Sequence, residues 1–226
     1  ILEGTFRQVA PFEPEHVELE ARLNDDLLDL TRITRGKLSL ERKIIDVHTV
    51  LQDAILTVRR EIQEKRIDFT VQTGAARHTV IGDAVRIQQV FWNVLKNAVK
   101  FTSEGGRVLV ETATAEDNSR IVVQISDTGI GMSREELDKI FDAFSQGDHA
   151  GHEDRSHRFG GLGLGLAISR MLVELHDGTI RASSPGYGRG STFVIEFPLT
   201  AFAGGNGDTA RVRAQSGSLE ARRPPV

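Results

Sequence analysis

Asn93, Asn97 and Lys100 are polar residues at helical spacing in an otherwise largely apolar stretch of the chain. Side chains three or four residues apart project from the same face of a helix. Amide oxygens are suitable ligands for a hard cation, and a lysine beside them can bind phosphate. The pattern therefore predicts a site for a metal ion and phosphate, with an ordinary solvent-exposed helix face as the alternative.

Asp127 stands at the predicted end of a strand and is followed closely by Gly129 and Gly131. A carboxylate in this position can accept a hydrogen bond from an exocyclic amine, such as the 6-amino group of adenine. Glycine lets the backbone turn sharply and approach a flat ring closely. These residues predict a site for a purine base, with an ordinary turn after a strand as the alternative.

The segment Gly160–Gly165 is rich in glycine and precedes a predicted helix. The free N–H groups and the positive dipole end of a helix N-terminus attract phosphate groups. The segment lacks the βαβ context of a dinucleotide site, and no lysine of the P-loop type follows it. It therefore predicts a phosphate site outside these two common classes.

The flanking sequence predicts the elements that must position these motifs. Periodicity and capping residues predict helices over Leu19–Leu38, Val47–Lys65 and Gly165–His176, a helix from the N-cap Asp83 to about Val99, and a short helix that begins at Ser133 with a capping box to Glu136. Alternation predicts strands over Ile67–Val71, Arg107–Thr112, Ile121–Ser126, Thr179–Ser183 and Ser191–Phe197. The expected fold class is α+β, a two-layer α/β sandwich with helices on one face of a mixed sheet.

Three regions are expected along the chain of 226 residues. Residues 1–46 would contain an amphipathic helix and a linker, residues 47–200 the sandwich, and residues 201–226 a tail that its composition predicts to be disordered. The chain begins without Met and without a signal-peptide pattern, so we expect a fragment or a processed chain.

Composition argues against several classes of protein. A net charge of −4 argues against a nucleic-acid-binding protein that depends on phosphate contacts. The absence of cysteine excludes disulfides and thiolate metal sites, and no apolar run approaches the length of a membrane span. We therefore expect no nucleic-acid partner and a cytoplasmic location, which leaves membrane anchoring of a longer parent protein open.

The first predicted helix has an apolar stripe that it cannot bury alone. We expect this helix to pair with another one, either upstream in a longer parent protein or in a second copy of the chain, which favours a homodimer. The alternative is that it lies on the sandwich. The stripe consists of Leu19, Leu23, Leu27, Leu30 and Ile33, and Gly36 after it is an expected helix end.

Taken together, these motifs resemble the ATP-binding domain of sensor histidine kinases, in the wider family that includes the Hsp90, gyrase B and MutL ATPases. The resemblance covers about Leu19 to Leu199. Asn93–Phe101 resembles the N box and Asp127–Gly131 the first glycine box, while Phe141–Phe144 resembles the F box and Gly160–Gly165 the second glycine box. The F box favours the kinase branch.

The resemblance implies roles for the polar residues, with ATP and Mg²⁺ as the ligands. Asn97 would be the principal Mg²⁺ ligand with Asn93 beside it, and Lys100 would contact phosphate. Arg158, from a lid formed by residues 132–160, would approach the γ-phosphate. Asn97, Lys100 and Arg158 would thus be the catalytic residues.

The resemblance also implies which residues would contact the nucleotide. Asp127 would bind the adenine amine, and Gly129 and Gly131 would admit the base. Phe141 and Phe144 would anchor the lid. The other nucleotide-binding positions would be Phe144, Gly161, Leu162, Gly163, Leu164, Gly165 and Thr192.

The helix Leu19–Leu38 resembles the second helix of the family's dimerisation and phosphotransfer hairpin, but no histidine of the chain stands in an acceptor motif. The resemblance therefore implies transfer of the γ-phosphoryl group to a histidine of a helix outside this chain, with a response-regulator receiver domain as a further partner. His149, His152 and His157 are close enough in sequence to suggest a transition-metal site, but no neighbouring cysteine or predicted helix supports one, so a solvated polar loop is the favoured interpretation.

Two other functions remain open at this stage. The chain can be a non-catalytic module that responds to ATP by changing its interactions, or an ATP-hydrolysing relative of Hsp90 and MutL. The second alternative needs a carboxylate to activate water one turn before Asn93, where the chain instead has Gln88 and Gln89.

Overall fold

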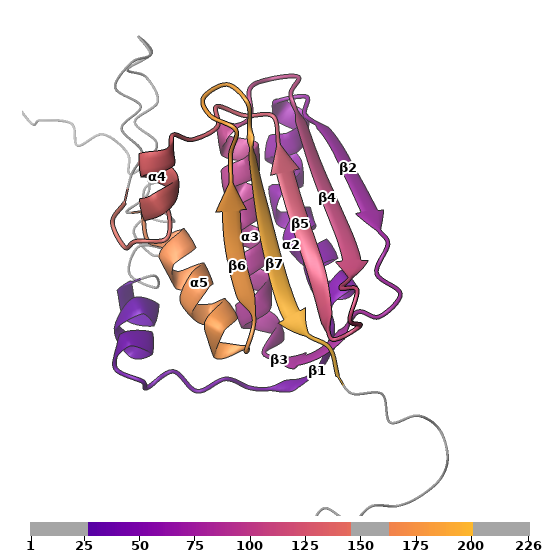
Figure 1. Ribbon diagram of the computed structural model, residues 1–226, viewed down its shortest axis with the longest axis vertical. Helices are drawn as coiled ribbons and strands as arrows, with labels where there is room; N and C mark the ends of the chain where they lie inside the picture. Colours follow the sequence, from indigo (N-terminus) through magenta and orange to yellow (C-terminus); the bar gives the residue numbers. More distant parts are fainter. Residues whose placement is uncertain (1–26, 146–162, 201–226) are drawn as a thin grey trace, which may run out of the picture.

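A five-stranded sheet and three helices form the two layers of the molecule, which we describe from a computed structural model for residues 27–145 and 163–200 (Figure 1). The strand order is β2 (Asp68–Thr73), β4 (Arg107–Thr114), β5 (Arg120–Asp127), β7 (Ser191–Pro198) and β6 (Thr179–Ser183). The covering helices are α2 (Val47–Glu64), α3 (Ala84–Phe101) and α5 (Gly165–Leu175). The expected α+β sandwich is confirmed.

The sheet is mixed because β2 pairs with β4 in parallel, while every other neighbouring pair is antiparallel. A parallel pair requires a crossover connection, and α3 lies in the segment that joins β2 to β4. The sheet topology thus places α3 behind the central strands, where Figure 1 shows it.

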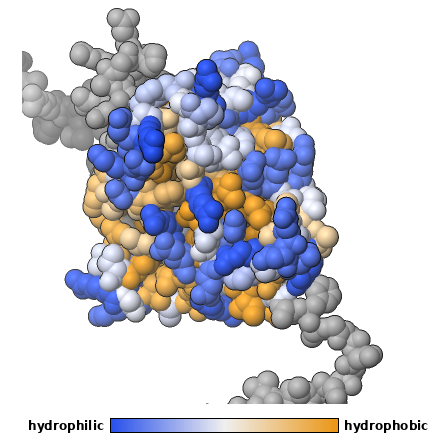
Figure 2. Space-filling view, viewed as in Figure 1, coloured by the Kyte–Doolittle hydropathy of each residue, from blue (hydrophilic) through white to orange (hydrophobic). Residues whose placement is uncertain are grey.

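Alternation along the central strands separates a buried face from an outer face. Val108, Val123, Ile125 and Ile195 are no more than 1% exposed and pack in the core beneath the helices. The residues between them are partly exposed, and Figure 2 shows this side of the molecule as a mixture of hydrophobic and hydrophilic surface. Apolar burial on one face is therefore what attaches the helix layer to the sheet.

The helix α3 is the most deeply buried of the three, and its N-terminus is capped as expected. The Asp83 carboxylate accepts hydrogen bonds from the backbone N–H groups of Val85 and Arg86. Further along the helix, Phe91 is fully buried and meets Phe197 of β7 edge to face, with ring centroids 6.3 Å apart.

A short two-stranded sheet closes one end of the sandwich. β1 (Lys43–Asp46) pairs antiparallel with β3 (Thr79–Gly82), and Val80 of β3 bridges to Leu199. The sequence pattern did not predict β3, because a strand of four residues is too short to show a period. Asp46 is both the last residue of β1 and the N-cap of α2. The domain boundary expected after residue 46 therefore falls at the junction of these two elements.

The first described residues, 27–34, are helical and end at Gly36 as expected. Gly36 has a φ of +63°, and its N–H donates to Ile33 while the N–H of Lys37 donates to Arg32, which is the Schellman pattern. Leu30 and Ile33 pack against the core, whereas Leu27 is 40% exposed. This part of the stripe therefore lies on the sandwich, and pairing with another helix stays a prediction.

A buried ion pair also joins this helical segment to α3. Asp29 is 7% exposed and accepts hydrogen bonds from Arg86 and from Gln89.

None of the described helices is both long and apolar enough to cross a membrane.

Replacing Asp83 by Ala should lower the free energy of unfolding by about 1–2 kcal/mol, because the cap of α3 is lost. The same carboxylate accepts a hydrogen bond from the backbone of Glu41, 3.0 Å away, so the connection before β1 should loosen too. Urea denaturation measures the change. Asp53→Ala, at an exposed position within α2, is the matched control, and an equal loss in both variants would contradict the capping role.

Candidate nucleotide site

Asn93, in the N box on α3, contacts the second glycine box. The amide is buried, and its Nδ2 donates to the carbonyl of Gly165, 3.0 Å away, and to Oγ of Ser169, 3.1 Å away. A Cβ at position 165 would lie 3.1 Å from Oδ1 of Asn93, which is tighter than most such contacts. Glycine at the start of α5 therefore lets this helix approach α3 closely.

The other end of α3 contacts the first glycine box. The N–H of Ile130 donates to the carbonyl of Phe101 at 3.2 Å, and a Cβ on Gly129 would lie 2.5 Å from the same oxygen. Gly131 has a φ of +66°, and a Cβ there would lie 2.1 Å from the carbonyl of Gly186. Contacts within the chain already require both glycines, independently of any base.

The Asp127 carboxylate at the end of β5 is held by backbone groups on one oxygen. Its Oδ1 accepts hydrogen bonds from the N–H groups of Gly129 at 2.8 Å and Ser191 at 3.2 Å. No group of the described residues donates to Oδ2. Burial raises the pKa of this carboxyl above its usual range, and the two N–H groups oppose that shift. Asp127 thus offers one acceptor atom to a donor from outside the protein.

Asn97 and Lys100 are partly buried on α3. Burial lowers the pKa of Lys100, and the nearby Lys96 and Lys65 lower it further. The Nζ of Lys65 donates to the carbonyls of Val99, Lys100 and Thr102 at the C-terminus of α3. Sequence analysis missed Lys65, whose position after α2 gives no sign of a partner so far along the chain.

The F box meets the second glycine box at Gly163. The N–H of Phe144 donates to the Gly163 carbonyl at 3.2 Å. Gly163 has a φ of +70°, and a Cβ there would lie 2.4 Å from the carbonyl of Ser145. Phe141 packs against the core, whereas Phe144 is 59% exposed. Their expected role as anchors of the lid stays a prediction.

Two residues expected to contact the nucleotide have side chains that contact other parts of the chain. Leu164 is 1% exposed and belongs to the core, which leaves only its backbone for a ligand. The Thr192 hydroxyl lies 3.1 Å from Oγ of Ser126, a residue that alternates with the buried Ile125 and so faces the outer side of the sheet. A contact between Thr192 and adenine stays a prediction. Arg158, Gly161 and Leu162 lie outside the described residues.

Residues 82–201 match the family described as histidine kinase-, DNA gyrase B- and HSP90-like ATPase. The chain belongs to this ATPase family. The match begins just before the cap of α3 and ends after β7, so it includes both described glycine segments and the N box.

Curated relatives of this ATPase-family chain are sensor kinases. It is 34% identical to the signal transduction histidine-protein kinase BarA of Escherichia coli over 85% of this chain and 22% of BarA. It is 34% identical to the sensor protein GacS of Pseudomonas syringae over 77% of this chain and 19% of GacS. The chain thus spans about a fifth of the length of these relatives.

Solved structures of histidine kinases resemble the ATPase domain as well. Full-length ShkA in complex with AMPPNP is similar with a TM-score of 0.70 and 28% identity, over 84% of this chain and 38% of ShkA. The mycobacterial sensor histidine kinase MprB is similar with a TM-score of 0.59 and 28% identity, over 71% of this chain and 99% of that one. The expected family is confirmed, and the roles of individual residues stay predictions.

Asp127→Asn should stabilise the ATPase domain at neutral pH, because the native fold holds the ionised carboxylate in a partly buried position. A carboxyl whose pKa is raised on folding disfavours the folded state above that pKa, and the effect disappears as pH falls through it. Urea denaturation of both proteins at several pH values should therefore show an advantage of the variant that shrinks on acidification. An advantage that grows on acidification would contradict the raised pKa.

Proposed function

We propose that the chain is the ATP-binding catalytic part of a two-component sensor histidine kinase, which transfers the γ-phosphoryl group of Mg-ATP to a histidine on another helix. One observation carries the proposal: α3 contacts both glycine boxes, at Asn93 and at Phe101. The groups expected to bind the cation, the base and the phosphates therefore surround one helix. The F box beside Gly163 favours the kinase branch.

The residues present fit such a nucleotide. Asp127 has a carboxylate oxygen without a partner among the described residues, as the adenine amine requires. Asn97 is a neutral oxygen ligand of the kind that Mg²⁺ accepts, and Lys100 supplies positive charge on the same helix face. Gly163 and Gly165 keep side chains away from the N-terminus of α5, where phosphates would bind.

Phosphoryl transfer depends mainly on positioning and charge neutralisation. Bound Mg²⁺ supplies positive charge beside the phosphates. In this chain, Asp127 would orient the base, Asn97 would hold the cation with Asn93 beside it, and Lys100 would contact the phosphates. Arg158 is proposed to approach the same group from the lid, and the acceptor histidine comes from outside the chain.

The proposed parent protein is a homodimer with cytoplasmic kinase domains, which can be membrane-anchored elsewhere in its chain. Its partners would be the helix that carries the acceptor histidine and a response-regulator receiver domain.

The contact of Asp29 with Arg86 and Gln89 favours one alternative, an ATP-responsive interaction module, because it connects the upstream helix to the N-box helix.

Supplying a histidine hairpin of a related kinase in trans tests the reaction. With Mg-ATP labelled at the γ-phosphate, the hairpin should acquire an acid-labile phosphohistidine. Nucleotide binding without any labelled histidine, on any of several hairpins, would favour the interaction module. Steady phosphate release without labelling would favour a hydrolase.

Asn97→Asp should weaken Mg-ATP binding roughly tenfold or more, because a carboxylate at the cation site also repels the phosphates. Titration calorimetry with Mg-ATP measures the affinity. The matched control is Asn118→Asp, the same chemical change in the turn between β4 and β5, which should bind like the wild type. Equal affinity in Asn97→Asp would exclude this residue as the metal ligand.

Adenine recognition is tested by comparing nucleotides. The wild type should prefer ATP over GTP, because Asp127 accepts a hydrogen bond from an amine that guanine replaces with a carbonyl. Asp127→Asn should reduce ATP affinity more than GTP affinity in competition binding. A wild type that binds the two nucleotides equally would contradict the assigned role.

A further inference from the structure

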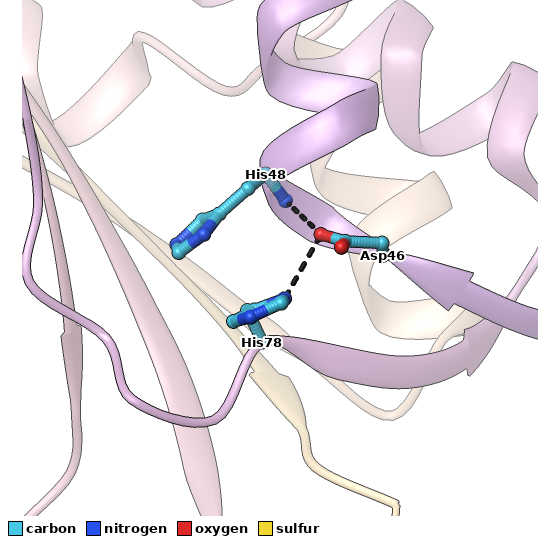
Figure 3. Close-up of side chains that lie close together, drawn as sticks. All are labelled: Asp46, His48 and His78. Atoms are coloured by element: carbon cyan, nitrogen blue, oxygen red, sulfur yellow. Dashed lines mark hydrogen bonds and ion pairs between the residues drawn. The ribbon is translucent and has the colours of Figure 1, made fainter.

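Asp46, His48 and His78 form a cluster at the junction of β1 and α2, and the ATPase proposal makes no use of it (Figure 3). One potential ligand atom from each residue can be chosen so that all three lie within 4.8 Å of one another. No other such trio of His, Asp and Glu occurs in the ranges 27–145 and 163–200. The cluster lies near the end of the sheet opposite Asp127, because Thr112, which contacts His48, lies toward the far end of β4.

The two imidazole rings lie face to face, with centroids 4.3 Å apart and planes inclined by 20°. Two protonated rings at this distance would repel each other. Burial lowers the pKa of His48 and the neighbouring His78 lowers it further, while Asp46 opposes the shift. A neutral ring is the form that binds a metal ion.

Each ring already has a partner for one of its nitrogens. His78 Nδ1 lies 3.0 Å from Oδ1 of Asp46, and His48 Nε2 lies 2.9 Å from the hydroxyl oxygen of Thr112. Histidine ligands of metals usually donate their second N–H to an oxygen such as the Thr112 hydroxyl, which leaves Nδ1 of His48 with its lone pair for an ion. Nδ1 of His78 already faces Asp46 across 3.0 Å, close to the separation of two ligands of one ion, so an ion bound to both would replace the hydrogen in this contact.

Asp46 is held in place by the start of α2. Its Oδ1 accepts hydrogen bonds from the N–H groups of His48 and Thr49 as the N-cap of the helix. The remaining oxygen, Oδ2, has no partner among the residues that the structure describes. The side chains of Asp46 and His78 are 44% and 35% exposed, so an ion can reach them from solvent.

We propose that Asp46, His48 and His78 form a binding site for a divalent transition-metal ion such as Zn²⁺. Two imidazoles and one carboxylate suit Zn²⁺, Ni²⁺ or Cu²⁺ better than Mg²⁺ or Ca²⁺, which prefer oxygen ligands. Ligands of a tetrahedral ion lie roughly 3.3 Å apart, so the side chains have to turn slightly to close around it. The ion would join the start of α2 to the segment before β3.

Titration calorimetry with Zn²⁺, without nucleotide, tests the site. The starting protein carries His149→Gln, His152→Gln and His157→Gln, so that these three histidines do not contribute. It should bind one Zn²⁺ per chain and should melt at a higher temperature with Zn²⁺ than without. Further variants His48→Gln and His78→Gln should each bind Zn²⁺ at least tenfold more weakly.

Asp46→Asn separates metal binding from folding, because Asn still caps a helix but lacks the charge. This variant should keep its melting temperature without Zn²⁺ and bind Zn²⁺ more weakly. Asp53→Asn on α2 is the matched control and should bind normally. Substituting Co²⁺ should give a visible absorption spectrum typical of nitrogen and oxygen ligands. Undetectable binding, or undiminished binding in the His48→Gln, His78→Gln double variant, would overturn the proposal.

Discussion

The buried amide of Asn93 is the contact on which the arrangement of the site depends. A buried amide without partners is costly, so Nδ2 has to be satisfied by Gly165 and Ser169 of α5. These bonds fix how close α5 lies to α3 and where its N-terminus begins. The position of this N-terminus also sets where the glycine-rich segment before α5 lies. Gly163 in that segment contacts the F box. One polar contact inside an apolar layer thus orders three motifs that are far apart in sequence.

Sequence patterns predicted most of the fold because its long elements have strong periods and clear caps. Asp83 and Ser133 marked helix starts correctly, and Gly36 marked a helix end. The strand β3 was not predicted, because it has only four residues and depends on pairing with β1. Its existence is decided by tertiary contacts, which a local pattern does not contain.

The residue types of the candidate site were predictable from the sequence, but the directions of their side chains were less so. Asp127 has the backbone contacts of an oriented carboxylate, whereas Leu164 turns into the core and the Thr192 hydroxyl turns toward Ser126. Glycines presented a different problem. Gly129 and Gly131 looked like residues that admit a ligand, but the backbone of the chain itself already approaches both. Lys65 and the cluster around Asp46 were missed because their partners are remote in sequence or ordinary in type.

The position of β7 has a consequence for how the chain acquires its structure. It is the last of the described strands in sequence, yet it lies between β5 and β6 in the sheet and pairs with both. During synthesis, β6 therefore has no neighbour in the sheet until β7 has left the ribosome. Until then, the inner faces of β5 and α5 are not fully covered. Such late, non-local pairing slows folding and exposes strand edges in the meantime. Loss of a few residues around Ser191–Pro198 would therefore separate β6 from the rest of the sheet and would not merely shorten the domain.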